Sequence, residues 1–326
     1  MRRTRAGKLV RKIYLYALRR VIESAATILA VLTINFVLIH SAPGDPALIM
    51  AGEYATPEII EATRHRWGLD QPLHVQLITY LAGVFRGDLG FSLDSNRPVL
   101  EVILSRMPNT LVLTTPILVI GPLLGLLLGA WAARNLGSRL DSALQILALV
   151  FYSVPTFWLG LVLLEVFAIR LQLFPLLGGG LVGDVPSILW HLVLPTSALV
   201  VAWTTPVFMR LGRASMMETL KEDYITTSRA IGYPDRVIFF KHALRNALLP
   251  SITMLGLMVG TVFMGAVLVE TVFTWPGLGL LLFEAIRARD YPLIMGMFTI
   301  VSLSVSISIF ITDIIYAFLD PRITYH

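Results

Sequence analysis

The chain has 326 residues, of which 56% are hydrophobic and only 14% are charged. A soluble domain of this size keeps about a quarter of its residues charged, so the composition excludes that class and indicates a polytopic membrane protein. The net charge is +5, and the basic residues lie mostly beside the apolar runs. A positive-inside membrane topology explains this placement better than nucleic-acid binding does. The sequence contains no cysteine, which excludes disulfides, thiolate metal sites and cysteine nucleophiles.

The first 20 residues are basic, and the apolar run that follows them is long enough to cross a bilayer. A charged lead before an apolar run also begins a signal peptide, but residues 40–43 make a poor cleavage site. We therefore expect residues 1–20 to be a basic cytosolic N-terminus and residues 21–40 to be a retained first span.

Six apolar runs are long enough to cross about 30 Å of hydrocarbon. Prolines within them predict kinks rather than breaks, because neighbouring helices can satisfy the freed backbone groups. Most of the lysines and arginines become cytosolic if the N-terminus is inside, so both termini are predicted to be cytosolic. The expected fold is an all-α polytopic membrane protein with six transmembrane helices. The runs are residues 21–39, 111–132, 143–164, 188–208, 248–273 and 293–318, and the prolines are Pro116, Pro122, Pro155, Pro195 and Pro206.

Residues 41–106 form a predicted outer loop that is long enough to fold into a small helical domain. Thr56 suits the N-cap of a helix, and Pro57 suits its first position. A second helix is predicted over about residues 72–85, ending at Gly87. This external domain is either a packed cap without chemistry or a docking surface for an outside partner.

Residues 107–326 hold the other five spans, and residues 210–250 interrupt them with a polar, basic stretch. The stretch is predicted to be a helical hairpin, because Gly232 suits the positive-φ position after a helix and Pro234 prevents the helix from continuing. A hairpin resting on lipid headgroups would also be amphipathic, but acids mixed with bases suit a protein partner better. The predicted apolar positions are Met217, Leu220, Tyr224, Ser228 and Ile231, then Val237, Phe240, Leu244 and Leu248.

The sequence offers no recognisable catalytic or metal site. The histidines lack metal-ligand spacing, the run of glycines from Gly178 to Gly180 lacks the lysine of a phosphate loop, and no Gly-x-Ser-x-Gly is present. An intramembrane enzyme would need a buried acid, base or nucleophile, and none is evident. An ion-driven carrier would need charged residues at the middle of the membrane, and none is evident there either. We expect a non-catalytic chain without a metal or cofactor of its own, supplied with energy by another chain through the hairpin. The ionisable residues near span ends are Glu23, Glu165, Glu270 and Asp313.

Several polar or aromatic residues within the spans are candidates for lining a substrate path. Helix–helix hydrogen bonding or packing explains each of them better, so the lining stays unassigned. These residues are Asn35, Tyr152, Ser153, Trp158, Thr204 and Thr205.

Short motifs along nearly the whole chain resemble the B-type permease subunit of bacterial dipeptide, oligopeptide and nickel ATP-binding-cassette importers. Each motif alone is weak, but together and in this order they are highly specific. They are Ser41-Ala42-Pro43-Gly44-Asp45-Pro46, Gly68-Leu69-Asp70-Gln71-Pro72-Leu73, Gly87-Asp88-Leu89-Gly90, Arg97-Pro98-Val99, Asp223-Tyr224-Ile225, Arg229-Ala230, His242-Ala243-Leu244-Arg245-Asn246-Ala247-Leu248-Leu249-Pro250, Trp275-Pro276-Gly277-Leu278-Gly279, Arg289-Asp290-Tyr291-Pro292 and Asp320-Pro321-Arg322-Ile323.

The resemblance implies a type I importer fold in the bacterial plasma (inner) membrane, surrounded by membrane lipid. It implies that this chain and a second, C-type permease subunit form the translocation path. Two cytosolic ATPase subunits, which hold the ATP and Mg, and an external solute-binding protein complete the assembly. No nucleic acid is expected as a partner.

Residues 210–250 correspond to the coupling loop of the family, whose general form is Glu-Ala-Ala, three residues, then Gly. Gly232 matches the glycine, but Thr226 stands where the family has its acid, so the resemblance implies no salt bridge from that position. Glu222 and Asp223 stand one turn earlier. The implied ATPase-coupling residues are Asp223, Tyr224, Thr226, Thr227, Ser228, Arg229, Ala230 and Gly232.

Di- or oligopeptides are the expected substrates, because the peptide branch of this family is broad. A permease for nickel or another small solute shares the motifs and is the alternative, although no His or Met cluster demands a metal. A stand-alone membrane enzyme would need an ionisable cluster facing a cavity, and a structural scaffold would not need the hairpin.

Overall fold

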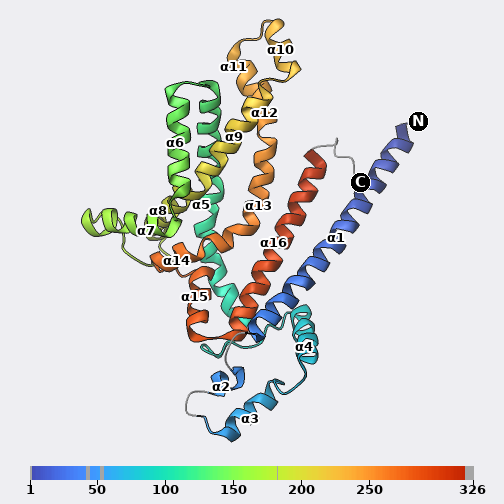
Figure 1. Ribbon diagram of the computed structural model, residues 1–326, viewed down its shortest axis with the longest axis vertical. Helices are drawn as coiled ribbons and strands as arrows, with labels where there is room; N and C mark the ends of the chain where they lie inside the picture. Colours follow the sequence, from blue (N-terminus) through green and yellow to red (C-terminus); the bar gives the residue numbers. More distant parts are fainter. Residues whose placement is uncertain (1, 42–44, 52–54, 182, 320–326) are drawn as a thin grey trace. The chain divides into compact units, whose positions relative to one another are not determined.

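The computed structural model describes residues 2–41, 45–51, 55–181 and 183–319, and it is helical along most of this length (Figure 1). Parts of two sequence motifs, Ala42-Pro43-Gly44 and Asp320-Pro321-Arg322-Ile323, lie outside the described residues. The chain divides into two compact units. The first comprises residues 1–108 and 281–326, and the second comprises residues 109–280.

The first unit contains both helices that were predicted for the outer loop. Thr56 has the extended backbone of an N-cap, with φ −72° and ψ 157°, and Pro57 follows at the first helical position. The second of these helices ends at Gly87, whose φ of 78° is the left-handed conformation that glycine adopts without strain. The helices of this unit are α1 (Arg2–His40), α2 (Pro46–Ala51), α3 (Pro57–Arg66), α4 (Leu73–Arg86) and α16 (Tyr291–Leu319), with the start of α5 (Val99–Arg134) and the end of α15 (Leu278–Ala288).

Asp290 fastens the loop before α5 to the start of α16. Its side chain is buried and accepts hydrogen bonds from the hydroxyl of Ser92 at 2.6 Å and the backbone N–H of Leu293 at 3.1 Å. Phe91 and Pro98 pair as an isolated antiparallel bridge at the ends of the same loop. Asp290 therefore caps α16 and holds the loop at the same time.

The second unit contains the rest of α5 and a series of helices broken by π-helical segments. Its members are α6 (Arg139–Ser153), α7 (Thr156–Leu163), η1 (Leu164–Arg170), α8 (Val185–Leu199), η2 (Val200–Thr204), α9 (Thr205–Thr219), α10 (Asp223–Ala230), α11 (Asp235–Val237), η3 (Ile238–Ala243), α12 (Leu244–Ala247), α13 (Leu249–Gly265), α14 (Val267–Phe273) and the start of α15.

Among the residues that the structure describes, four helices are long and apolar enough to cross a membrane, and two sharply bent helix pairs raise the number to as many as six. One bent pair falls in the predicted third span, where α6 and α7 meet at 95°. The prediction of a kink at Pro155 is therefore wrong. Proline lacks an N–H and forces Val154 into extended backbone, with φ −82° and ψ 125°, so α6 ends there. In contrast, Pro195 lies inside the continuous α8.

The second bent pair, α14 and α15, meets at 85° around the buried carboxylate of Glu270. This carboxylate accepts hydrogen bonds from the N–H groups of Gly279 at 2.6 Å and Leu280 at 3.2 Å, and from the hydroxyl of Thr110 at 2.9 Å. It therefore caps the start of α15 and ties it to α5.

The turn between α14 and α15 is fixed to α5 by two more bonds. The indole N–H of Trp275 donates to the carbonyl of Asn109, and the Asn109 amide donates to the carbonyl of Pro276, both at 2.8 Å. A Cβ at Gly277 would collide with Glu270 and Thr110. Part of the Trp-Pro-Gly-Leu-Gly motif thus has a packing role.

The expectation that the spans hold no buried acid is wrong. Glu270 lies near the end of the fifth predicted span and is buried, and Asp141 and Asp290, just before the third and sixth predicted spans, are buried too, but each carboxylate accepts several hydrogen bonds. Because backbone N–H groups, hydroxyls and one arginine solvate them, these acids have structural partners rather than an open reaction site.

Three glycines of α5 form a stripe along which α9 makes backbone contact. They recur every fourth residue, at Gly121, Gly125 and Gly129. A Cβ at Gly125 would lie 2.6 Å from the carbonyl oxygen of Thr205, and one at Gly129 would collide with the carbonyl of Met209. Small residues at this spacing let helix backbones approach closely in membranes. The spacing is visible in the sequence, but its helical partner is not.

Candidate functional site: the hairpin between α9 and α13

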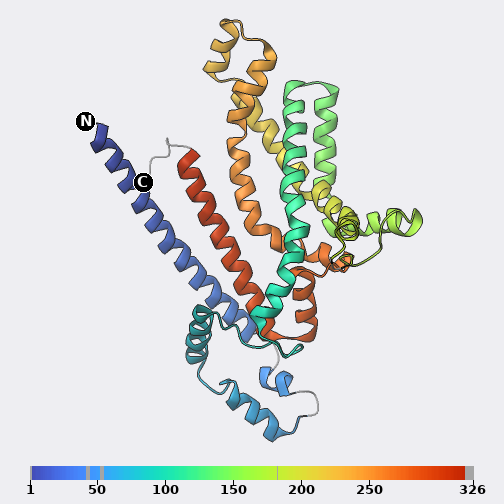
Figure 2. The same cartoon turned by 180° about the vertical axis from the view of Figure 1, so that it is seen from behind.

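The polar stretch at residues 210–250 folds as a helical hairpin. It lies at the same end of the second unit as the turn between α5 and α6 (Figures 1 and 2). Its first arm comprises the end of α9 and α10. Its second arm comprises α11, η3 and α12, which lead into α13. The predicted hairpin is confirmed in outline, and its details differ from the prediction in two ways.

The turn at Gly232 has the conformation that the sequence predicts. Gly232 has a φ of +91°, and its N–H donates to the carbonyl of Arg229 at 3.0 Å. The N–H of Tyr233 donates to the carbonyl of Ser228 at 3.2 Å. This pair of bonds is the Schellman motif, which satisfies the last carbonyls of α10.

The first arm is not one continuous helix, contrary to the prediction. Helix α9 ends at Thr219, and Glu222 has extended backbone, with φ −64° and ψ 147°, before α10 begins at Asp223. Acidic side chains are favourable at the start of a helix, where the backbone N–H groups leave partial positive charge. Glu222 and Asp223 therefore mark a new helix start rather than a continuing polar face.

The buried faces of both arms also differ from the predicted ones. In the first arm Ile225 is fully buried, whereas Tyr224 and Ile231 are exposed. In the second arm Ile238 and Ala243 are buried and Phe240 is exposed. The π-helical turn of η3 holds more residues than an α-turn, so the buried positions are five apart and a 3.6-residue period misplaces the face. The buried cluster is Ala130, Ala133, Met216, Ile225, Ile238, Phe239, Ala243 and Ala247.

The two arms are fastened to each other by Tyr224. Its phenol oxygen accepts a hydrogen bond from the Asn246 amide at 2.8 Å and donates one to the carbonyl of His242 at 3.4 Å. The ring of Tyr233 lies 5.4 Å from the His242 ring, centroid to centroid. These contacts make the hairpin a single packed body.

The hairpin presents most of the predicted coupling residues to its surroundings. Ser228 is the exception, since it is buried and donates its hydroxyl to the carbonyl of Tyr224 at 2.7 Å. Three exposed apolar side chains were not predicted to face outward: Ile231, which is 70% exposed, Tyr233 and Phe240. The exposed coupling residues are Asp223, Tyr224, Thr226, Thr227, Arg229, Ala230 and Gly232.

A buried ion pair joins the base of the hairpin to the first turn of α6. Arg213 of α9 donates to both oxygens of Asp141, from Nε at 2.7 Å and from Nη2 at 2.9 Å. Asp141 also accepts from the N–H of Gly137 and the amide of Gln145. The sequence assigns Arg213 only to positive-inside charge, because its partner lies 72 positions away.

The candidate residues for the substrate path differ in burial and in hydrogen bonding. Thr204 is buried against Gly121, and the hydroxyl of Thr205 donates to the Gly121 carbonyl at 3.4 Å, so both serve helix packing. The amide nitrogen of Asn35 is buried with no hydrogen-bond partner among the described residues. Trp158 is exposed. In the described part of the chain, no group of three acidic, His or Cys side chains could hold a metal ion.

The described part of the chain, helical with four to six apolar spans and a polar hairpin between them, defines a polytopic membrane protein. Residues 125–325 match the model of the family described as binding-protein-dependent transport system inner membrane component. Residues 13–114 match the N-terminal model of the same kind of component. The chain belongs to this family and is a multi-pass protein of the bacterial inner membrane.

Named relatives match over nearly their whole length. The chain is 39% identical to the probable D,D-dipeptide transport system permease protein DdpB of Escherichia coli (strain K12), covering 90% of this chain and 92% of the relative. It is 36% identical to the oligopeptide transport system permease protein AppB of Bacillus subtilis (strain 168), covering 95% and 99%. It is 38% identical to the glutathione transport system permease protein GsiC of Salmonella choleraesuis (strain SC-B67), also covering 95% and 99%.

Proposed function

We propose that this chain is the permease subunit of an ATP-driven importer for di- or oligopeptides, and that the hairpin is its ATPase-coupling element. The observation that carries the proposal is the hairpin: a packed polar body with an exposed apolar tip, in a chain that is otherwise apolar. The names of the three relatives refer to a dipeptide, an oligopeptide and glutathione, which favours peptides over the nickel alternative.

The proposed assembly contains a second, C-type permease subunit, two ATPase subunits and an external solute-binding protein. The chain itself is non-catalytic: ATP and Mg belong to the ATPase subunits. Residues 1–20 form the cytosolic N-terminus, residues 41–106 form an external domain, and residues 107–326 form the permease core with the hairpin on the cytosolic side.

In the proposed mechanism, closure of the ATPase dimer displaces the hairpins of the two permeases. Because Tyr224 and the turn at Gly232 fasten the arms together, the hairpin moves as one body. The displacement passes into α9, which is held to α6 by Arg213 and to α5 along the glycine stripe. Packed helices then shift between inward-open and outward-open arrangements.

The direct test is reconstitution of the permease pair in proteoliposomes with and without the ATPase subunits. We expect uptake of a labelled dipeptide only when both ATPase subunits, ATP and the loaded binding protein are present. ATP hydrolysis should rise when loaded binding protein is added. Uptake by the permeases alone, or hydrolysis of ATP by this chain alone, would refute the proposal.

Gly232→Val tests the hairpin turn. No atom lies within 4 Å of a Cβ built at Gly232, so only the backbone conformation resists substitution. A left-handed residue other than glycine costs about 1–2 kcal/mol, and more for a β-branched residue. We expect Gly232→Val to reduce peptide uptake per ATP hydrolysed, whereas Gly232→Asn, which tolerates positive φ, should retain coupling. Equal uptake by wild type and the valine variant would contradict the assignment.

A further inference from the structure

Helix α4 exposes an apolar stripe although it lies in the loop predicted to be outside the membrane. Ile78 is 64% exposed and Phe85 is 74% exposed, and the two lie about two turns apart on the same face of the helix. Between His74 and Arg86 the helix has no charged residue. A surface helix of a water-soluble domain carries charged or polar residues on its outward face, so the exposed face of α4 is unlike that of a helix that contacts water.

Contacts on the opposite side of α4 show how far along α1 and α16, two spans of the same unit, this helix lies. Tyr80 and Thr299 share a hydrogen bond between their hydroxyls at 2.7 Å, and the Tyr80 ring stacks on Phe36 at 5.8 Å between centroids. Thr299 lies eight residues into α16 from Tyr291, which is about 12 Å along the helix axis. The middle of α4 therefore lies beside the outer turns of α1 and α16 rather than beyond them.

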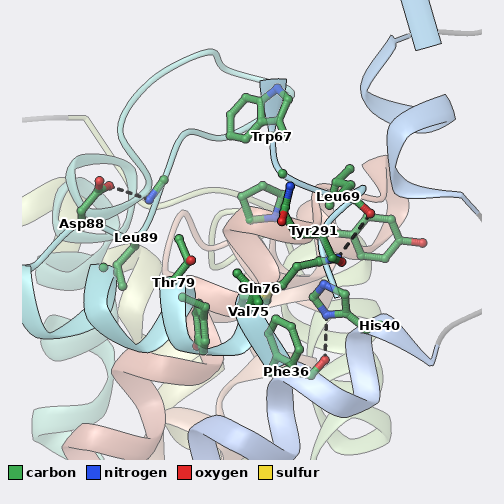
Figure 3. A pocket seen from close by; sticks show the side chains of 17 residues that line it. Phe36, His40, Trp67, Leu69, Val75, Gln76, Thr79, Asp88, Leu89 and Tyr291 are labelled. Carbon is green, nitrogen blue, oxygen red and sulfur yellow. Dashed lines mark hydrogen bonds between the residues drawn. The ribbon is translucent and has the colours of Figure 1, made fainter. Parts of the chain in front are cut away.

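A cavity of about 340 Å³ lies on the inner side of α4, between its first turns and the ends of α1 and α16 (Figure 3). Its wall includes Trp67, Tyr80 and Tyr291. Tryptophan and tyrosine gather where a bilayer meets water, because their rings are apolar and their polar atoms seek hydrogen bonds. Burial raises the pKa of the Tyr80 phenol, as expected for a hydroxyl held away from bulk water.

We propose that α4 lies in the outer leaflet of the bilayer, with the face of Ile78 and Phe85 against lipid acyl chains. The partner of this surface is lipid rather than the external binding protein. A protein-docking face would carry polar groups around its apolar centre, whereas the exposed residue between Ile78 and Phe85 on this face is Ala82. Part of the outer domain is then a membrane-interface helix.

The absence of cysteine allows a direct test with single-cysteine variants of the otherwise unmodified chain. Ile78→Cys and Phe85→Cys report on α4. Ile59→Cys on α3 is the matched control, because Ile59 is also an exposed isoleucine of the outer loop, at 50%. Each variant is assembled with its partner subunits in phosphatidylethanolamine–phosphatidylglycerol nanodiscs and labelled with a nitroxide.

The readout is the collision rate of each nitroxide with molecular oxygen, which concentrates in lipid, and with a water-soluble nickel chelate. At positions 78 and 85 we expect an oxygen-to-nickel ratio several-fold higher than at position 59. Ratios equal to that of Ile59→Cys would overturn the proposal in favour of a solvated cap. Shielding from both probes would overturn it in favour of a covering protein chain. The test depends on membrane assembly and not on transport, so it can fail while the proposed function stands.

Discussion

Asp141→Ala is expected to destabilise the permease by about 3 kcal/mol. Removing one member of a buried ion pair leaves the other charge uncompensated, and that cost typically reaches about 3–5 kcal/mol. We take the lower end because Arg213 retains some exposure, at 19% of its side chain. The measurement is the thermal unfolding midpoint of the assembled complex in nanodiscs.

The matched control is Glu165→Ala, which removes the acid of the ion pair between Glu165 and Arg170 at 2.8 Å in the same unit. That pair is exposed, so its loss should cost less than about 1 kcal/mol. Similar shifts in the two variants would contradict the argument.

The same pair has an expected effect on coupling as well as on stability. The double variant Asp141→Leu/Arg213→Met removes both charges, so it should recover much of the lost stability. It should still take up less peptide per ATP hydrolysed, because the bidentate link between α6 and α9 is gone. Wild-type coupling in a fully stable double variant would show that the pair is only structural.

Gly125→Val is expected to separate α5 from α9. The added Cβ would lie 2.6 Å from the carbonyl oxygen of Thr205 and 2.8 Å from the backbone nitrogen of Met209. Backbone atoms cannot move aside as a side chain can, so the cost should reach or exceed the roughly 1–3 kcal/mol of overpacking. The measurements are the unfolding midpoint and the yield of complex assembled with the ATPase subunits.

Leu124→Val on the same helix is the control for Gly125→Val, because Leu124 is exposed and its shortening should change stability by no more than about 0.5 kcal/mol. Assembly of the Gly125 variant at the control's yield would mean that the two helices are not held together along the glycine stripe.

Local signals in the sequence were sufficient for local features. The turn at Gly232 and the two helices of the outer loop follow from glycine and proline chemistry within a few residues. Periodicity failed where the backbone left the α-helical repeat: η3 shifted the buried face of the hairpin, and Pro155 ended α6.

Long-range partners could not be predicted from one sequence. Asp141 and Arg213 are 72 positions apart, and the donors to Glu270 include a threonine 160 positions away. The glycine stripe of α5 was recognisable by its spacing, but only the structure shows that α9 occupies it. The two exposed apolar surfaces, on the hairpin and on α4, depend on which side of each helix is covered.

The hydrogen bonds of Glu270 have a consequence for how the protein enters its membrane. Thr110 is synthesised long before Glu270, whereas the two backbone donors follow it by nine and ten residues. An acidic side chain left unpaired in a span costs up to about 3 kcal/mol during insertion. Insertion is therefore favoured when α14 and α15 leave the translocon together, with the bend already closed, beside an α5 that is already in place.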